Sequence, residues 1–198
     1  MTTTIEQALR NIPEQPLPDL EAAAAAGGRV DVAYATLDSP VGTLLLASTP
    51  RGLVRLAYLD HADEAAILQD LATRISPRVL SAPRRLEEAR RELDEYFSHA
   101  RRRFELPLDW RLTGPGFGRR VLQVTSKIPF GQVSTYKEVA GRAGSPRGYR
   151  AAGNALGANP LPIVVPCHRV LHAGGGLGGY TGGLERKQLL LALEDVSA

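Results

Sequence analysis

Three strand-like runs in the first half of the chain constrain its fold most strongly. The runs VDVAYATL, TLLLAST and LVRLAYL follow one another between residues 30 and 59. The turn clusters Asp38–Gly42 and Pro50–Gly52 separate them, and turns this short join neighbouring antiparallel strands. The pattern therefore predicts an antiparallel meander. Helical patterns follow at about residues 63–75 and 84–98, which indicates a small α+β domain.

The second half of the chain is predicted to be helical and rich in loops. Phe117, Val121, Val124 and Ile128 recur at the spacing of one helical face. Two further segments, TYKEVAGRAG and SPRGYRAAGNALG, predict short helices separated by a turn that contains glycine. Two short helices joined in this way are typical of a helix-turn-helix.

The second of these short helices is the expected recognition helix. Ser145 is its expected N-cap, and Pro146 then lies in its first turn. Arg147 and Arg150 lie near its start, where recognition helices meet DNA. Its many alanines and glycines would let the backbone approach another surface closely, although tight packing against a neighbouring helix explains them equally well.

A glycine- and proline-rich segment, Leu112–Gly116, is the expected linker between two domains. We therefore expect an N-terminal extension over residues 1–30, an α+β domain over 31–112 and a helix-turn-helix active-site domain over 113–198. Charge divides at the same place, because residues 1–112 carry 14 Lys or Arg against 17 Asp or Glu and residues 113–198 carry 10 against 4. The basic second part suggests a polyanionic partner such as nucleic acid, with an ordinary solvated surface as the alternative.

The composition is typical of a globular protein outside the membrane. The chain is 43% hydrophobic and 23% charged, and no apolar run approaches the length of a membrane span. The segment MTTTIEQALR lacks the basic and then apolar layout of a secretion signal. One cysteine and no export signal predict the cytoplasm, where a thiol stays reduced.

That single cysteine, Cys167, lies in the pentapeptide Pro-Cys-His-Arg-Val. A lone thiol cannot form an internal disulfide, and one thiol beside one imidazole is too few ligands for zinc, so no metal site is expected. If the residue is functional, it acts as a nucleophile, because the thiolate is a strong one and a neighbouring His helps to generate it. The alternative is a small buried hydrophobic residue.

His168 is adjacent to Cys167 in sequence, so their side chains diverge in an extended segment and a bridging water is the expected proton path. An imidazole used in this way needs a carboxylate to orient its other nitrogen. The acids after the cysteine are Glu185, Glu194 and Asp195, and Glu194 ends the apolar helical segment LERKQLLLALE.

Several segments together resemble the O6-alkylguanine-DNA alkyltransferases, also called methylated-DNA–protein-cysteine methyltransferases. NPLPIVVPCHRV, GYTGGLERKQLLLALE, TYKEVA and RAAGNALGANP carry the resemblance over about residues 113–195. It is weaker over 31–110, where DSPVGTLLLA is similar to a hairpin of the family's N-terminal domain. The resemblance implies an α+β fold: a small ribonuclease H-like domain of antiparallel sheet and helices, followed by a helical winged helix-turn-helix domain.

The resemblance also implies a chemistry. A monomer without a cofactor would transfer the O6-alkyl group of guanine in double-stranded DNA to Cys167, irreversibly and once per molecule. O4-alkylthymine is a second candidate substrate. His168 would act through water, Glu194 would complete the relay, Asn159 would be a hinge that supports the site, and Tyr136 would give a proton to the departing guanine. We also expect the thiol to have a depressed pKa, because this relay and a cationic recognition element surround it.

A second group of residues would contact the lesion and the duplex, which must be opened because a thiolate cannot reach a base inside it. Arg150 matches an arginine finger that fills the gap left by the rotated nucleotide, and Tyr180–Gly182 match a loop that closes over it. The expected substrate- and DNA-binding residues are Arg147, Arg150, Ala151, Gly153, Pro162, Tyr180, Thr181 and Gly182. Without the resemblance, Tyr136 is a core tyrosine, Glu194 a solvated acid and Arg150 a phosphate contact.

The chain departs from the family pattern in four ways. Thr181 stands where serine is common, and Tyr149 places a bulky residue before the finger. The extension falls outside the match, and the cysteines with which some relatives bind zinc are missing.

Three other functions are weighed against the alkyltransferase. The first is a non-catalytic, lesion-sensing alkyltransferase-like DNA-binding protein, but such relatives lack the cysteine. The second is a helix-turn-helix regulator that uses Cys167 as a sensor. A cysteine hydrolase is the third, and no oxyanion-hole pattern supports it.

Overall fold

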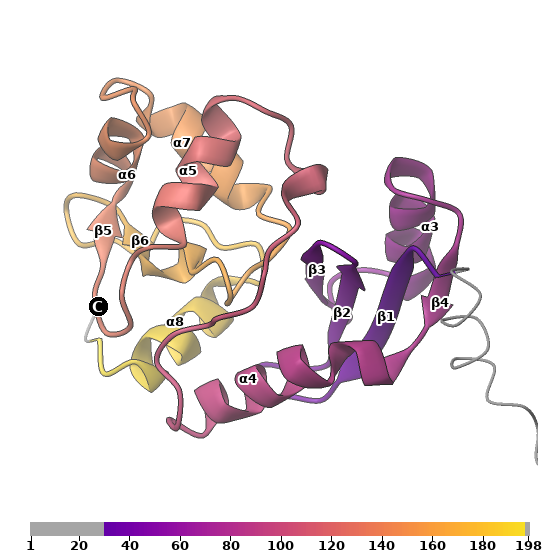
Figure 1. The fold of residues 1–198 in the computed structure, drawn as a ribbon. Coiled ribbons are helices and arrows are strands. Elements are labelled where there is room, and N and C mark those ends of the chain that lie inside the picture. The colour runs from indigo at the N-terminus through magenta and orange to yellow at the C-terminus, as the bar shows by residue number, and fades with distance from the viewer. Residues whose placement is uncertain (1–29, 197–198) are drawn as a thin grey trace, which may run out of the picture.

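The computed structural model describes residues 30–196, so most of the expected N-terminal extension lies outside the described residues. The described chain forms a sheet domain followed by a helical domain, in agreement with the predicted α+β class (Figure 1). No helix between residues 30 and 196 has the length and apolar character needed to cross a bilayer.

The N-terminal domain is built on a four-stranded sheet. Its strands are β1 (Val32–Leu37), β2 (Leu44–Thr49), β3 (Gly52–Tyr58) and β4 (Val79–Ser81), in the order β3-β2-β1-β4. The first three pair antiparallel, which confirms the predicted meander. The fourth strand, which the sequence analysis did not predict, pairs parallel with β1, so the sheet is mixed where an antiparallel one was expected. The chain reaches this edge through helix α3 (Glu64–Arg74), and a strand of three residues is too short to show an alternating pattern.

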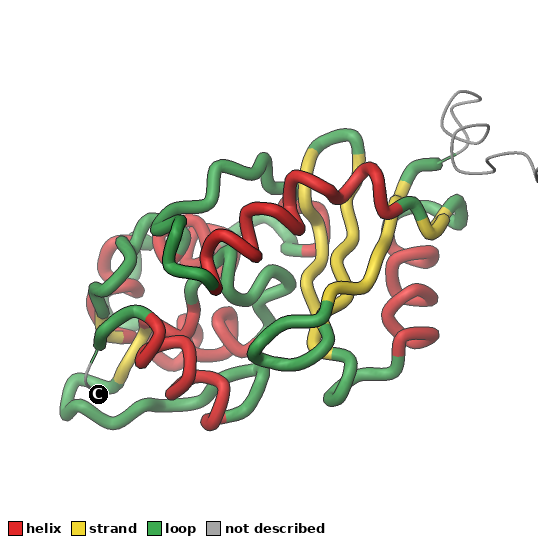
Figure 2. The backbone as a smooth tube through the Cα atoms, turned by 90° about the horizontal axis from the view of Figure 1, so that it is seen from below, coloured by secondary structure: helices red, strands yellow, loops and turns green. Residues whose placement is uncertain are grey.

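Alternating side chains on the strands give the sheet two apolar faces. On β2, Leu45 and Ala47 pack with Ile67 and Leu71 of α3 on one face of the sheet. Leu44 and Leu46 point to the opposite face and join the apolar cluster there. Helix α4 (Glu87–Phe97), preceded by a 3₁₀ turn at Pro83–Leu86, covers that second face. Both predicted helices of this domain are thus present, and the sheet lies between them (Figure 2).

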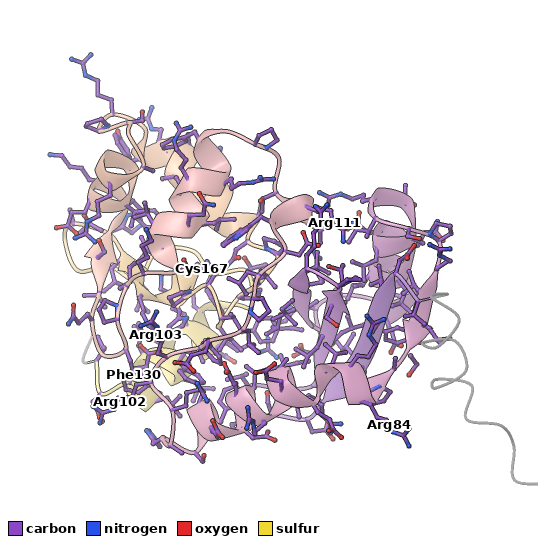
Figure 3. All side chains as sticks on the ribbon, viewed as in Figure 1. Arg84, Arg102, Arg103, Arg111, Phe130 and Cys167 are labelled. Atoms are coloured by element: carbon purple, nitrogen blue, oxygen red, sulfur yellow. The ribbon has the colours of Figure 1, made fainter. Side chains whose placement is uncertain are left out.

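The segment after α4 carries the chain from one domain to the other. Arg101 pairs with Glu92 and Glu95, and the Arg102 guanidinium lies 5.6 Å from the centre of the Phe130 ring, at the end of α4 (Figure 3). The segment then runs along β3, where the Asp109 amide donates to the Leu53 carbonyl at 2.8 Å.

Gly52 makes this close pairing possible. Its φ is +128°, and a Cβ there would lie 2.0 Å from the Pro107 carbonyl oxygen, which no side chain tolerates.

The C-terminal domain contains four α-helices, a 3₁₀ turn at Cys167–Arg169 and a short two-stranded ribbon among its described residues. The elements are α5 (Phe117–Thr125), β5 (Ser134–Thr135), α6 (Tyr136–Arg142), α7 (Tyr149–Gly157), β6 (Val170–Leu171) and α8 (Leu184–Leu193). Helices α5, α6 and α7 pack against one another, and α6 and α7 form the predicted helix-turn-helix (Figure 1). A capping box between Thr135 and Glu138 begins α6.

The recognition helix begins later than expected. Gly148, not Ser145, is the N-cap of α7, because the Gly148 amide donates to the Ser145 carbonyl at 2.8 Å and closes a turn over these four residues. Proline favours the second position of such a turn, which is where Pro146 stands. Arg147 therefore lies in the turn before the helix, and Arg150 in its first turn.

The parallel ribbon of β5 and β6 brings two distant segments together. Ser134 is opposite Val170, and Thr135 is opposite Leu171. The ribbon therefore places Tyr136, the first residue of α6, beside the segment that contains the single cysteine.

Candidate functional site

A hollow of about 570 Å³ opens in the C-terminal domain, with Cys167 in its wall. Its sides come from the start of α6, from α7 and from the loop between β6 and α8. The residues that line it are Tyr136, Tyr149, Arg150, Gly153, Leu156, Gly157, Cys167, His172, Gly179, Tyr180 and Thr181. Figure 3 shows Cys167 inside the domain, away from the surface near Arg102 and Phe130.

Asn159 holds the cysteine in place. Its side-chain nitrogen donates to the Val165 carbonyl at 2.8 Å and to Cys167 Sγ at 3.2 Å. Its side-chain oxygen accepts from the Leu161 amide at 3.0 Å. One buried amide thus braces both sides of the loop before the thiol.

That loop contains a strained residue. Ile163 is fully buried and has a φ of 71°, a left-handed conformation that β-branched residues rarely adopt. Such a conformation costs on the order of 1–3 kcal/mol and persists only where the surroundings enforce it. Here the Val165 amide donates to the Leu161 carbonyl at 2.8 Å and closes the turn around it.

The thiol is protonated in this state of the protein. Burial raises the pKa of Cys167 to about 11, although the Asn159 hydrogen bond and the nearby Lys187 ammonium act in the opposite direction. The expected depressed pKa is therefore wrong. His168 does not lower the thiol pKa through a positive charge, because burial lowers the pKa of the imidazole and its Nε2 is bonded to Glu194.

His168 is oriented by that carboxylate, as expected. Nε2 lies 2.9 Å from Glu194 Oε1, both side chains have no exposed surface, and burial lowers the pKa of His168. The neutral ring therefore carries its proton on Nε2. Nδ1 is buried and has no protein partner, so its lone pair is left to accept a hydrogen.

Glu194 is buried, not solvated, and it gathers hydrogen bonds from several segments. Arg169 donates to both of its oxygens at 2.8 and 2.7 Å, and the Tyr96 hydroxyl of α4 donates at 2.6 Å. Burial alone would raise the pKa of this carboxyl, but the bonds from His168 and Arg169 lower it to about 2. The carboxylate is charged at every physiological pH.

Lys187 belongs to the site and was missed by the sequence analysis. It has no exposed surface, and its ammonium donates to the Val170 carbonyl at 2.7 Å and to the Leu177 carbonyl. Burial lowers its pKa to about 8. A lysine in LERKQLLLALE is ordinarily solvated, but position 187 is spaced three and four residues from the buried Leu190 and Leu191, and that spacing was the available signal.

Tyr136 faces the hollow from the start of α6. Its hydroxyl accepts a hydrogen bond from the Gly179 backbone, and its ring packs 5.1 Å from the His172 ring. Burial, and then the nearby Cys167, raise the pKa of this tyrosine, so its hydroxyl keeps its proton. Gly178 lies so close that a Cβ there would be 2.5 Å from the hydroxyl oxygen.

The predicted residues of the recognition helix separate into two groups. Arg150 lines the hollow, with its guanidinium 5.7 Å from the centre of the Tyr149 ring, and Gly153 lines it opposite Tyr136. Arg147 and Ala151 are exposed and lie outside the lining.

Pro162 also lies outside the lining, buried in the loop before Cys167. Tyr180 and Thr181 do line the hollow, and the Thr181 hydroxyl donates to the Gly157 carbonyl at 3.0 Å. Gly182 is buried against the rings of Tyr58 and Tyr180. Within residues 30–196 no group of three or more potential His, Cys, Asp or Glu ligands could hold a metal ion.

The raised thiol pKa has a direct consequence for reactivity. Because the thiolate is the reactive form, we expect iodoacetamide to modify Cys167 at a rate that keeps rising through pH 10 and levels off only near the pKa of about 11. Intact-mass spectrometry at a series of pH values measures this. The urea-unfolded chain is the control and should level off near pH ~8.5. A plateau below pH ~8.5 in the folded protein would show that the thiol is activated at rest.

The Glu194 carboxylate should stabilise the fold. Glu194→Gln leaves the Arg169 guanidinium buried without its counter-charge, so we expect a loss of about 3–5 kcal/mol in the free energy of unfolding, measured by urea titration. Because folding lowers the pKa from 4.5 to about 2, this contribution is complete above pH 4.5 and disappears as the pH falls through 2. Glu185→Gln, on the exposed first turn of the same helix, is the control and should change stability by less than ~0.5 kcal/mol. Equal changes in the two variants would contradict this role.

Comparison with known proteins gives a consistent result over both domains. Residues 32–110 match the family model for the 6-O-methylguanine DNA methyltransferase ribonuclease-like domain, and residues 116–196 match the model for the DNA-binding domain of the same family. The chain is similar to the methylated-DNA–protein-cysteine methyltransferase of Mycolicibacterium paratuberculosis, with 41% identity over 163 residues, 82% of this chain and 92% of that protein. It is 36% identical to the constitutive enzyme of that name from Bacillus subtilis, over 83% of this chain and 96% of that protein.

Solved structures agree with the sequence matches. A crystal structure of Mycobacterium tuberculosis OGT in complex with DNA superimposes with a TM-score of 0.71 at 38% identity, covering 82% of this chain and 93% of that one. With two family models matched over most of its length and relatives near 40% identity, this chain belongs to the 6-O-methylguanine DNA methyltransferase family.

Proposed function

We propose that this protein repairs DNA by transferring the alkyl group from O6 of guanine to Cys167, once per molecule, as a monomer and without a cofactor. The observation that carries the proposal is a buried thiol in the wall of a hollow, followed directly in sequence by a buried imidazole whose Nδ1 has no partner. O4-alkylthymine remains a second candidate substrate.

The proposed step forms one bond and breaks one. Cys167 Sγ attacks the alkyl carbon, the bond from that carbon to O6 breaks, and its electron pair stays on guanine. The thiol proton passes through water to His168 Nδ1, which Glu194 stabilises as the ring becomes charged. The Tyr136 hydroxyl supplies the proton that guanine gains, and the proton taken up by His168 returns through water to Tyr136, so no charge remains on either side chain. The thioether product does not hydrolyse, which makes each molecule act once.

The neutral resting thiol suits this chemistry. A protein that reacts once is inactivated by any other electrophile that alkylates its thiol. A thiol with a pKa of about 11 avoids this, because it is mostly protonated and unreactive at neutral pH. The proton relay then removes the proton only when a substrate occupies the hollow and excludes bulk water. Asn159 holds the sulfur at the position from which the attack occurs.

The duplex must present the lesion to this hollow. A base inside the stack is out of reach, so the target nucleotide rotates out and enters between α7 and the loop that carries Tyr180 and Thr181. Arg150, at the rim, is placed to occupy the vacated position. Arg147, in the turn before the helix, is placed to contact a backbone phosphate.

The transfer itself is tested by intact mass. After incubation with a duplex that contains O6-methylguanine, we expect the protein mass to increase by one methyl group, localised by peptide mapping to Cys167. Cys167→Ser should show no mass change while keeping its affinity for the duplex, because the thiol contacts no phosphate. Tight lesion binding by the wild type without a mass change would instead identify the non-catalytic lesion sensor.

Replacing Arg150 and replacing Arg147 should affect different steps, repair of the duplex lesion and binding to DNA in general. Because a finger holds the gap left by the rotated nucleotide, Arg150→Ala should slow repair of duplex DNA by roughly tenfold or more. Its reaction with the free base O6-benzylguanine, which needs no rotation, should be nearly unchanged. Arg147→Ala, the matched control, should weaken binding to all duplexes and reduce the salt slope by about one unit. Equal losses on duplex and free base in Arg150→Ala would show that Arg150 shapes the hollow instead.

A further inference from the structure

The loop that covers the hollow is fastened to the N-terminal domain through one tyrosine pair. The hydroxyl of Tyr58, the last residue of β3, lies 2.8 Å from the hydroxyl of Tyr180 in the covering loop. Their rings meet at an angle of 66° with centres 6.3 Å apart. On its other side the Tyr180 ring meets the His168 ring edge to face, also at 6.3 Å. A residue of the sheet domain thus contacts the catalytic imidazole through a single intermediary.

Arg186 of α8 fastens the same place from a second direction. Its guanidinium lies 4.6 Å from the centre of the Tyr58 ring, and it pairs with Asp60 just after β3. It also donates to the Val41 carbonyl of the first hairpin at 2.5 Å and to the Gly182 carbonyl of the covering loop at 2.9 Å. One side chain therefore joins two loops of the N-terminal domain to the cover of the hollow.

Gly182 is the point where this contact is tightest. A Cβ there would lie 2.5 Å from the Tyr58 ring and 2.9 Å from the Tyr180 ring. Any side chain would push the two rings apart. The family resemblance places Gly182 in the loop that closes over the base, but its own neighbours are the two tyrosines.

The covering loop needs external support because it has little rigidity of its own. Four of the seven residues in Leu177–Gly183 are glycine, which loses more conformational freedom on ordering than any other residue. The C-terminal domain anchors this loop at Leu177, Gly179 and Thr181. Tyr180, which lies between two of these anchors, is held by Tyr58, and Gly182, which follows them, packs against the Tyr58 ring and accepts from Arg186. A turn closes this part of the loop, because the Gly183 amide donates to the Tyr180 carbonyl at 3.1 Å.

We propose that Tyr58 and Arg186 are positioning residues for alkyl transfer: from outside the hollow they set the position of Tyr180 and thereby the closure of the loop over the extruded base. This inference rests on the proposed function. Neither residue lines the hollow, so each acts through the covering loop. The N-terminal domain is then a working part of the active site, because the pocket is correctly formed only while the two domains are held together here.

The test removes one hydroxyl group. Tyr58→Phe should slow transfer by about three- to tenfold, the value of one hydrogen bond, on both duplex O6-methylguanine and free O6-benzylguanine. Loss on both substrates distinguishes loop positioning from a defect in nucleotide rotation, which affects the duplex alone. Tyr34→Phe removes a hydroxyl from β1 of the same sheet and is the matched control, with an expected rate equal to the wild type. Arg186→Lys, which cannot make all the contacts of the guanidinium, should be slowed on both substrates as well.

A double-mutant cycle separates positioning from general destabilisation. If Tyr58 acts through Tyr180, the variant with both Tyr58→Phe and Tyr180→Phe should be no slower than the slower single variant. The proposal would be overturned if the double variant were slowed by the product of the two single effects, or if Tyr58→Phe transferred the alkyl group at the wild-type rate. All rates are measured without urea. The midpoint of a urea titration shows for each variant that it is folded under these conditions.

Hydrogen exchange gives a readout that does not depend on catalysis. Amides in Leu177–Gly183 should exchange faster in Tyr58→Phe than in the wild type, while those of α5 stay unchanged. If the wild type transfers no alkyl group, the proposed function fails, and exchange still decides whether Tyr58 orders the loop. Unchanged exchange in this loop would overturn the positioning role whatever the activity.

Discussion

The buried carboxylate of Glu194 is the interaction on which the rest of the site depends. It lies at the end of α8 and receives hydrogen bonds from Arg169 and His168 in the turn after Cys167 and from Tyr96 in α4. The Arg169 guanidinium also donates to the Ile128 carbonyl at 2.6 Å. One carboxylate thus holds together the cysteine turn, the last helix and the sheet domain, and it does so at the atom that orients the imidazole.

A buried ion pair loses much of its attraction to the cost of removing two charges from water. Apolar packing therefore often stabilises a fold equally well. What it adds here is a defined proton arrangement. With Glu194 charged, His168 Nε2 keeps its hydrogen and Nδ1 stays open. The pKa of Cys167 is set instead by burial, which outweighs the Asn159 hydrogen bond and the nearby Lys187 ammonium. Under the proposed chemistry, Glu194 therefore orients the base, while burial keeps the nucleophile neutral.

Local patterns in the sequence predicted most elements, and long-range effects account for the errors. The meander, α3, α4 and the two helices of the helix-turn-helix each have a pattern within a few residues. The parallel pairing of β4, by contrast, depends on where α3 delivers a three-residue strand. The thiol pKa depends on burial by the whole domain and on Lys187, 20 residues away in sequence, and no local pattern reveals either. Lys187 was missed because a lysine normally points to solvent. Only its spacing of three and four residues from the buried Leu190 and Leu191 indicated that it is buried.

Two hydroxyl groups explain why the sheet domain matters to a site that it does not line. Tyr96, on the helix that covers one face of the sheet, donates to Glu194 beneath the imidazole. Tyr58, at the end of a strand on the same face, bonds to Tyr180 at the cover of the hollow. Both rings belong to the cluster that continues from the sheet into the C-terminal core. Glu194 and the covering loop are therefore both bonded to the sheet domain, and a shift between the domains would disturb both at once. Under the proposed chemistry, these two bonds to the same domain keep the extruded guanine at a fixed distance from the Cys167 thiol. A fixed distance matters because the transfer depends on correct positioning of the two reacting groups.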